Sequence, residues 1–149
     1  MSDLLVVDAS VVLKWLIPED GSVEALKLRS VNSFAAPSLL FSEVTNILWK
    51  KVRRGEVSEP DALEAVGILG RLAIDIQSDR DLCADACRLS IVLDHPAYDC
   101  FYLVAAARLD TILVTADEKL LRKLEAKRAH EWCAAVVSLK DMPNTGSVR

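Results

Sequence analysis

The sequence predicts an α/β fold in which helices flank a central parallel sheet. Five short apolar runs alternate along the chain with longer segments whose apolar residues recur at helical spacing. This alternation is typical of parallel strands joined by helical crossovers. Hydrophobic residues make up 52% of the 149 residues and charged residues 27%, with only 5 Gly and 5 Pro. Such a composition indicates an ordered, helix-rich chain rather than a disordered one.

The five expected strands are short and mostly apolar. They comprise residues 4–8, 33–36, 73–76, 111–115 and 134–139. The fourth of these runs, Thr-Ile-Leu-Val-Thr, has the length and the β-branched side chains of a strand that is buried inside a parallel sheet. We therefore expect the segment that follows this run to begin at the carboxyl edge of the sheet.

Helices are expected between the strands, and local signals mark where several of them begin and end. Ser10 is expected to cap the first helix, and Pro18 ends it. Pro37 is expected in the first turn of the long third helix, which Gly55 stops. Leu26 is a predicted core contact of the second helix. The helical segments are residues 11–16, 23–30, 37–54, 58–72, 79 or 81 to 93, a segment that starts near 96, and one that starts at 118.

The chain is long enough for one domain and short for two. We expect residues 1–141 to form that domain and residues 142–149, which are polar and contain Pro and Gly, to form a flexible tail. The chain begins without the basic region of a secretory signal, and its longest apolar run, Cys100–Ala107, is far shorter than the ~20 residues of a membrane span. Cys83 and Cys87 are interpreted as small buried residues. With four cysteines and no CxxC motif, a reduced, cytoplasmic protein is expected.

Four acidic side chains interrupt the apolar pattern or follow a strand directly: Asp8, Glu43, Asp99 and Asp117. Asp8 ends the first strand and Asp117 lies just beyond the fourth, and open α/β sheets bind ligands beyond the carboxyl ends of their strands. Glu43 and Asp99 each lie in the apolar stripe of a helix, because their neighbours three, four and seven residues away are mostly apolar. An unpaired charge that points toward a core is very costly, so these positions need an explanation.

Taken singly, each acid has a structural explanation. Asp8 or Asp117 can cap the helix that follows it, Glu43 can pair with a buried arginine, and Asp99 can accept a hydrogen bond from a hydroxyl group. Taken together, clustered carboxylates do not all stay ionised without a counter-cation, and no matching set of Lys or Arg occupies those faces. Mg²⁺ or Mn²⁺ meets this need because both ions favour oxygen ligands.

Four segments that contain these acids carry a resemblance to a known family. They are VVDASVVLKWL with Asp8 and Ser10, SEVTNIL with Glu43, AYDCFYLVAA with Asp99, and LVTADEKL with Thr115 and Asp117. Because these segments stand in the family's order and spacing, the chain resembles a PIN-domain ribonuclease of the VapC type found in bacterial and archaeal toxin–antitoxin pairs. Each motif is weak by itself, but the set of four is specific and spans nearly the whole chain.

The resemblance implies a mostly parallel, five-stranded PIN-like fold and an endoribonuclease that depends on Mg²⁺ or Mn²⁺. It also implies an RNA substrate, a homodimer, a cognate antitoxin as partner, and products with 5′-phosphate and 3′-hydroxyl ends. The family's site positions correspond to the acids Asp8, Glu43, Asp99 and Asp117, the hydroxyl group of Ser10, and Thr115 in the motif ahead of the last acid. One ion, held mainly by three of these acids (Asp8, Asp99 and Asp117), is expected to activate water. That ion, or a second near Glu43, is expected to stabilise the leaving oxygen.

The grip on RNA is expected to be local, because the formal net charge is −4. Lys14 is one candidate phosphate contact. The helix after the last acid offers a second group of cations, which are Lys119, Arg122, Lys123, Lys127 and Arg128. The structural alternative for this group is a solvated helix face with ion pairs such as Glu118–Arg122.

Two tryptophans and one histidine lie near these motifs and have structural interpretations. Trp15 and Trp49 fall in apolar helical patterns, so they are interpreted as core or dimer contacts rather than as base-stacking residues. His95 is interpreted as a helix-start residue rather than as a catalyst.

Two other functions stay open on the sequence alone. The first is a Mg²⁺-dependent phosphatase whose aspartyl nucleophile follows the first strand. Such phosphatases carry a second acid two residues later, where this chain has Ser10, and the later lysine motif that they need is not found. The second is a PIN-like binding module that has lost turnover, against which the four intact acids argue.

Overall fold

A five-stranded, all-parallel sheet forms the centre of the structure, a computed structural model that describes residues 3–126 and 135–143. The strands lie side by side in the order β3-β2-β1-β4-β5. Their bounds are Leu4–Val7 for β1, Ser33–Pro37 for β2, Ile74–Gln77 for β3, Leu113–Thr115 for β4 and Val136–Ser138 for β5. The predicted α/β class and all five predicted strands are therefore confirmed.

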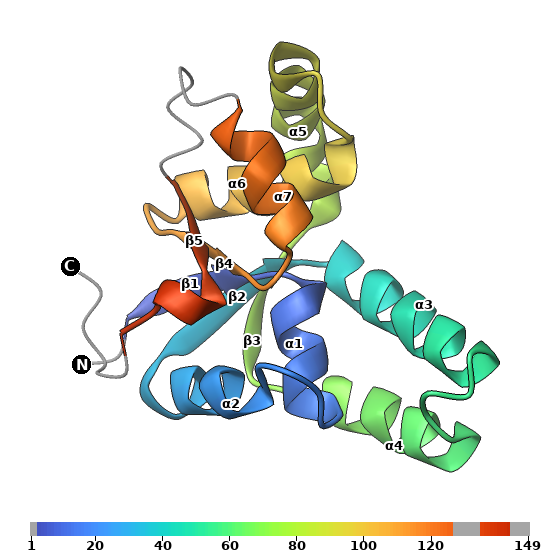
Figure 1. Cartoon of the computed structure of the whole chain (residues 1–149). Helices are drawn as coiled ribbons and strands as arrows, with labels where there is room; N and C mark the ends of the chain where they lie inside the picture. The colour runs from blue at the N-terminus through green and yellow to red at the C-terminus, as the bar shows by residue number, and fades with distance from the viewer. Residues whose placement is uncertain (1–2, 127–134, 144–149) are drawn as a thin grey trace.

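Helices cover both faces of this sheet (Figure 1). Their bounds are Ala9–Leu16 for α1, Ser22–Val31 for α2, Leu39–Arg53 for α3, Glu59–Leu69 for α4, Asp79–Leu93 for α5, Ala97–Arg108 for α6, Glu118–Glu125 for α7 and Leu139–Asp141 for the short 3₁₀ helix η2. Helices α5, α6 and α7 lie on one side of the sheet and α1 and α2 on the other. Helices α3 and α4 pack against each other and extend together away from the sheet.

The two central strands place the ends of two site motifs next to each other. Val7 of β1 pairs with Val114 of β4, and both side chains are fully buried between the helical layers. Burial of one such side chain stabilises the fold by roughly 1.5–3 kcal/mol. The next residue of each strand is polar, so the register brings Asp8 and Thr115 side by side at the carboxyl edge of the sheet.

Two helices begin at other residues than the sequence predicts. Asp8, not Ser10, caps α1, because its carboxylate accepts hydrogen bonds from the amides of Ser10 and Val11. Pro37 does not open α3 but ends β2, where it pairs with Gln77 of β3. The two predictions were wrong for different reasons. The cap at Asp8 is a local contact that the sequence left open as an alternative, whereas the strand extends to Pro37 because β2 pairs with β3, which local propensity does not contain.

Exposure also differs from prediction on the surfaces of two helices. Leu26 was a predicted core contact but is 48% exposed, while Ala25 and Leu28 form the buried face of α2. Cys83 and Cys87 are exposed on α5 rather than buried. Helical periodicity identifies faces, but it does not say which face another element covers.

The two tryptophans have different environments. Trp15 lies in the core as predicted: its Nε1 donates a hydrogen bond to the Ala25 carbonyl at 2.8 Å, and its ring packs edge-on against Phe34. Trp49 is 52% exposed, so its assignment to the core was wrong; the Arg53 guanidinium lies 4.9 Å from its ring centre. A dimer contact through Trp49 stays a prediction.

The boundary at the carboxyl end of the domain also stays a prediction. The 3₁₀ helix ends at Asp141, and the last two described residues continue beyond it to Pro143. The rest of the expected tail, residues 144–149, lies outside the described part of the chain. Among residues 3–126 and 135–143, no helix has the length and the apolar composition needed to cross a membrane.

Candidate active site

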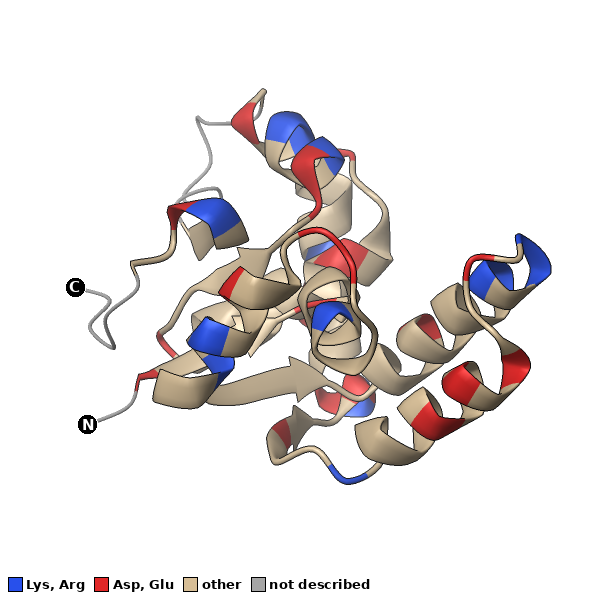
Figure 2. Ribbon diagram, turned by 60° about the horizontal axis from the view of Figure 1, so that its bottom comes forward, with Lys and Arg blue, Asp and Glu red and all other residues tan. Residues whose placement is uncertain are grey.

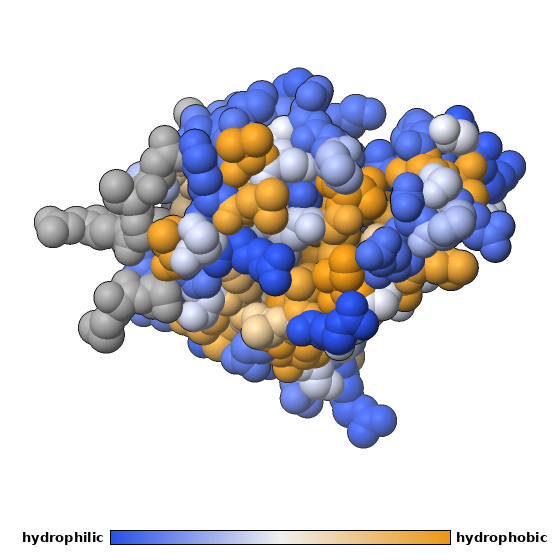
Figure 3. Space-filling view, turned by 90° about the horizontal axis from the view of Figure 1, so that it is seen from below, coloured by the Kyte–Doolittle hydropathy of each residue, from blue (hydrophilic) through white to orange (hydrophobic). Residues whose placement is uncertain are grey.

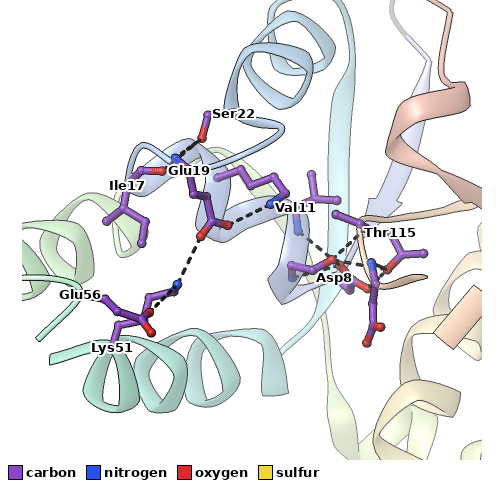
Figure 4. A network of polar contacts seen from close by, with 12 residues as sticks. Asp8, Val11, Ile17, Glu19, Ser22, Lys51, Glu56 and Thr115 are labelled. Atoms are coloured by element: carbon purple, nitrogen blue, oxygen red, sulfur yellow. Dashed lines mark hydrogen bonds and ion pairs between the residues drawn. The ribbon is translucent and has the colours of Figure 1, made fainter. Parts of the chain in front are cut away.

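Asp8 is the most deeply buried carboxylate at the carboxyl edge of the sheet, with 8% of the residue exposed. Its Oδ1 accepts a hydrogen bond from the Ser10 hydroxyl. Its Oδ2 accepts one from the Thr115 hydroxyl (Figure 4). Each hydroxyl in turn accepts a backbone amide from the segment after β4: Ala116 donates to Ser10 at 2.9 Å, and Asp117 donates to Thr115 at 3.0 Å. The two predicted hydroxyl positions therefore lock the Asp8 carboxylate to the end of β4.

Burial also changes the acidity of Asp8. Removal from water raises the pKa of this carboxyl from 3.8 to about 6, although the hydrogen bonds from Ser10, Thr115 and the Val11 amide oppose the rise. The negative charge of Asp99 adds to the rise. Asp99 is therefore close enough to act on Asp8 electrostatically, as the sequence predicts.

Glu43 reaches the same cluster from the middle of α3. Burial is the main cause that raises its pKa from 4.5 to about 7, and the negative charges of Asp99, Asp8 and Asp79 contribute to this rise. Its Oε1 accepts a hydrogen bond from the Tyr102 hydroxyl at 2.7 Å, which ties α3 to α6. Because burial and the adjacent carboxylate raise the pKa of Tyr102 far above its ordinary value, this hydroxyl stays a neutral donor.

Asp99 lies in the first turn of α6 and is partly exposed. Its Oδ2 lies 2.7 Å from Nε2 of His95, whose side chain is only 2% exposed. His95 does precede the helix start at Pro96, as predicted, but its contact with a site carboxylate was not predicted. The structure thus brings Asp8, Glu43 and Asp99 together from β1, α3 and α6.

Asp117 enters the site mainly through its backbone. Its side chain is exposed and caps α7, with Oδ1 accepting the amides of Lys119 and Leu120 at 3.0 and 3.1 Å. Its own backbone amide donates a hydrogen bond to the Thr115 hydroxyl, which in turn bonds to Asp8. The capping role that the sequence left open for Asp117 is therefore present.

The donor set suits a hard divalent cation, although the side chains do not form a closed site as they stand. Within the described residues, no three His, Cys, Asp or Glu side chains are grouped tightly enough to hold a metal ion. No described Lys or Arg forms an ion pair with any of the four acids. Among these same residues, no hydrogen-bond donor occupies Oε2 of Glu43, Oδ1 of Asp99 or Oδ2 of Asp117. Oxygen ligands and an uncompensated negative charge are the chemistry that Mg²⁺ and Mn²⁺ match.

One acidic residue near the site was not singled out by the sequence. Asp79 begins α5, as one of the two predicted starts, and its Oδ1 accepts the Leu39 amide at 3.1 Å. Its own amide donates to the Ser38 hydroxyl at 3.0 Å. These two bonds fasten the start of α5 to the start of α3, the helix that carries Glu43. No local signal reveals such a pair because its members are about 40 residues apart.

The side chains predicted to contact phosphate differ in their exposure and in their ion pairs. Lys14 is engaged, because its Nζ lies 3.0 Å from Glu19, which also pairs with Lys51 at 3.4 Å (Figure 4). Lys119, Arg122 and Lys123 are exposed on α7, where basic residues gather in Figure 2. Glu118 pairs with Lys140 at 3.3 Å, rather than with Arg122 as the structural alternative supposed. Lys127 and Arg128 lie outside the described residues.

Comparisons with known proteins agree with this geometry. The sequence profile of the PIN domain family matches residues 5–127. Ribonuclease VapC3 of Pyrobaculum aerophilum is 31% identical over 125 residues, which cover 82% of this chain and 95% of that protein. The crystal structure of PAE2754 from Pyrobaculum aerophilum superposes with a TM-score of 0.66 at 22% identity, over 94% of this chain and 93% of that one, and so shows the same fold. The chain belongs to the PIN-domain family, as the four acidic motifs predicted.

Proposed function

We propose that this chain is an endoribonuclease that hydrolyses RNA phosphodiester bonds with the help of Mg²⁺ or Mn²⁺. The observation that carries the proposal is the cluster of Asp8, Glu43 and Asp99. The negative charge of Asp99 contributes to the raised pKa of the other two carboxyls, and no described Lys or Arg forms an ion pair with any of the three. A relative that covers most of the chain is named a ribonuclease, which supports RNA as the substrate.

The side chains of the cluster have distinct proposed roles. Three of them, Asp8, Asp99 and Asp117, hold the principal ion. Glu43 binds either the same ion or a second one. When bound, the ion supplies a Lewis acid that lowers the pKa of water and stabilises the leaving oxygen. Ser10 and Thr115 hold Asp8 at the strand end, and Tyr102 holds Glu43 by Oε1 so that Oε2 is left for the ligand.

We further propose that the chain is the toxin of a toxin–antitoxin pair. A cavity of about 440 Å³ lies where α1 ends beside α4, and it supports this proposal; its apolar floor is accompanied by a polar set, Glu56, Ser58, Asp61 and Glu64. Its apolar lining consists of Leu16, Ile17, Pro18, Val57, Ala65 and Ile68. Figure 3 shows apolar surface gathered in this region between hydrophilic margins. A cavity with apolar and acidic lining suits an amphipathic segment of an antitoxin that carries apolar and basic side chains. The homodimer and the cytoplasmic location stay predictions.

The test is cleavage of labelled RNA by the purified full-length protein with Mg²⁺, Mn²⁺ or excess EDTA. We expect cleavage only with a divalent ion, and we expect Asp8→Asn and Asp99→Asn to abolish it while the far-ultraviolet spectrum stays that of a folded protein. Glu64→Gln is the matched control, because it removes an exposed carboxylate on α4. Normal cleavage by Asp8→Asn would refute the proposal, and trapping a phosphoenzyme at Asp8 would favour the phosphatase instead.

A further inference from the structure

A buried histidine ring reaches Asp99 from the short connection between α5 and α6. His95 stands between Asp94, which ends α5 in the left-handed conformation (φ 49°), and Pro96, which precedes α6. Its backbone amide donates a hydrogen bond to the Ser90 carbonyl at 3.0 Å, and its side chain is 2% exposed. Backbone and packing therefore fix the ring independently of its contact with Asp99.

The contact between the ring and the carboxylate is short. Nε2 of His95 lies 2.7 Å from Oδ2 of Asp99. A carboxylate that binds a metal ion can only accept hydrogen bonds, so in that state Nε2 must be the donor of this bond. The Asp99 side chain is 37% exposed, so it is much less enclosed by packing than the ring. The fixed ring thus holds the more exposed carboxylate by one oxygen and leaves Oδ1 for another ligand.

We propose that His95 is a positioning residue, which holds Asp99 by Oδ2 so that Oδ1 is presented to the divalent cation. This inference rests on the proposed function. Glu43 is held in the same manner, since Tyr102 bonds only its Oε1, whereas Asp8 is held through both oxygens by two hydroxyls. Partners that orient metal-binding side chains typically contribute a factor of roughly 10–100 to metal affinity.

A purely structural role makes a different prediction. The His95–Asp99 bond also spans the first turn of α6, whose N-cap residue Pro96 makes no capping bond with its side chain. Either role predicts that removing the ring lowers stability. Only the positioning role predicts a loss of metal affinity that disappears once the Asp99 carboxylate is gone.

The experiment compares His95→Gln with His95→Leu, two side chains of similar size of which only the first carries an N–H donor. Binding of Mn²⁺ alone to the full-length protein is measured by electron paramagnetic resonance, and thermal unfolding is followed in EDTA. We expect His95→Leu to weaken Mn²⁺ binding by roughly 10–100-fold and His95→Gln to recover most of that loss. In an Asp99→Asn background, His95→Leu should cause no further loss, because no carboxylate remains to be positioned.

The inference alone is overturned if wild type binds Mn²⁺ and His95→Leu binds it equally well, or if the loss persists undiminished in the Asp99→Asn background. Failure of the wild type to bind Mn²⁺ removes the proposed function, and the inference with it. If His95→Leu does not fold, ¹⁵N spectra of the histidine rings in wild type and Asp99→Asn decide. A proton held on Nε2 of His95 that Asp99→Asn releases supports the inference, whereas a ring without that proton overturns it.

Discussion

The carboxylate cluster makes the metal-free protein less stable as the pH rises. Burial is the main cause that raises the pKa of Asp8 from 3.8 to about 6 and that of Glu43 from 4.5 to about 7. The folded state therefore binds these two protons more tightly than the unfolded chain does. Each group therefore contributes most to the free energy of unfolding at a pH below its pKa in the unfolded chain. This contribution falls as the pH rises from the pKa in the unfolded chain to the pKa in the folded state, and it does not change at higher pH. The combined window runs from about pH 4 to about pH 7.

The expected fall between pH 5 and pH 8 is about 3 kcal/mol. Asp8 contributes about 1.4 kcal/mol, because about one pH unit of its window lies above pH 5. About two pH units of the Glu43 window lie above pH 5, but this side chain is only partly buried, and solvent screening reduces its share to roughly half, again about 1.4 kcal/mol.

The assay is urea unfolding in EDTA at pH 5 and pH 8, followed by circular dichroism. Asp8→Asn is neutral at both pH values, so it should lose about half of the pH dependence, whereas the exposed control Glu64→Gln should keep all of it. Mn²⁺ at about 100 times its dissociation constant should restore about 2.7 kcal/mol at pH 8. A wild type that is equally stable at pH 5 and pH 8, or an Asp8→Asn variant with the full dependence, refutes this reasoning.

Three further variants test the supporting contacts. Thr115→Val removes the donor to Asp8 and should cost roughly 1–3 kcal/mol in urea unfolding, against about 0.5 kcal/mol or less for the exposed Thr45→Val; equal costs contradict the account. Tyr102→Phe removes a hydrogen bond that lowers the Glu43 pKa, so the acidic limb of the RNA-cleavage profile should move to higher pH; an unchanged profile contradicts this. Trp15→Ala should cost roughly 3–5 kcal/mol of unfolding free energy, and the exposed Trp49→Ala far less; similar losses contradict the burial difference.

The sequence predicts the fold and the acidic cluster because both leave strong local patterns. Short apolar runs mark the buried strands, and the parallel arrangement then places the residues after β1 and β4 at one edge. Asp8 and Thr115 meet there because Val7 pairs with Val114. Glu43 can be identified from the sequence because a charge inside an apolar helical stripe is rare. Its burial in the structure raises its pKa.

Contacts between distant segments leave no comparable pattern. The bond from Tyr102 to Glu43 spans 59 residues and joins two helices, so neither helix reveals it alone. His95 looks like an ordinary helix-start residue until its burial and its distance to Asp99 are known. The prediction of exposure fails for a similar reason. Trp49 fits an apolar periodicity, but no described element covers its face of α3. These features depend on which distant segment packs against a helix face, and periodicity does not encode that.

The central claim is that Asp8 and Asp99, together with Asp117 or Glu43, bind one divalent cation. Crystals of the full-length protein grown with Mn²⁺, with data collected at the manganese absorption edge, test it most directly. We predict an anomalous difference peak within about 2.5 Å of an oxygen of Asp8 and an oxygen of Asp99, with Glu43 or Asp117 completing the site. A fully occupied manganese peak elsewhere on the molecule, or no peak at saturating Mn²⁺, would contradict the account.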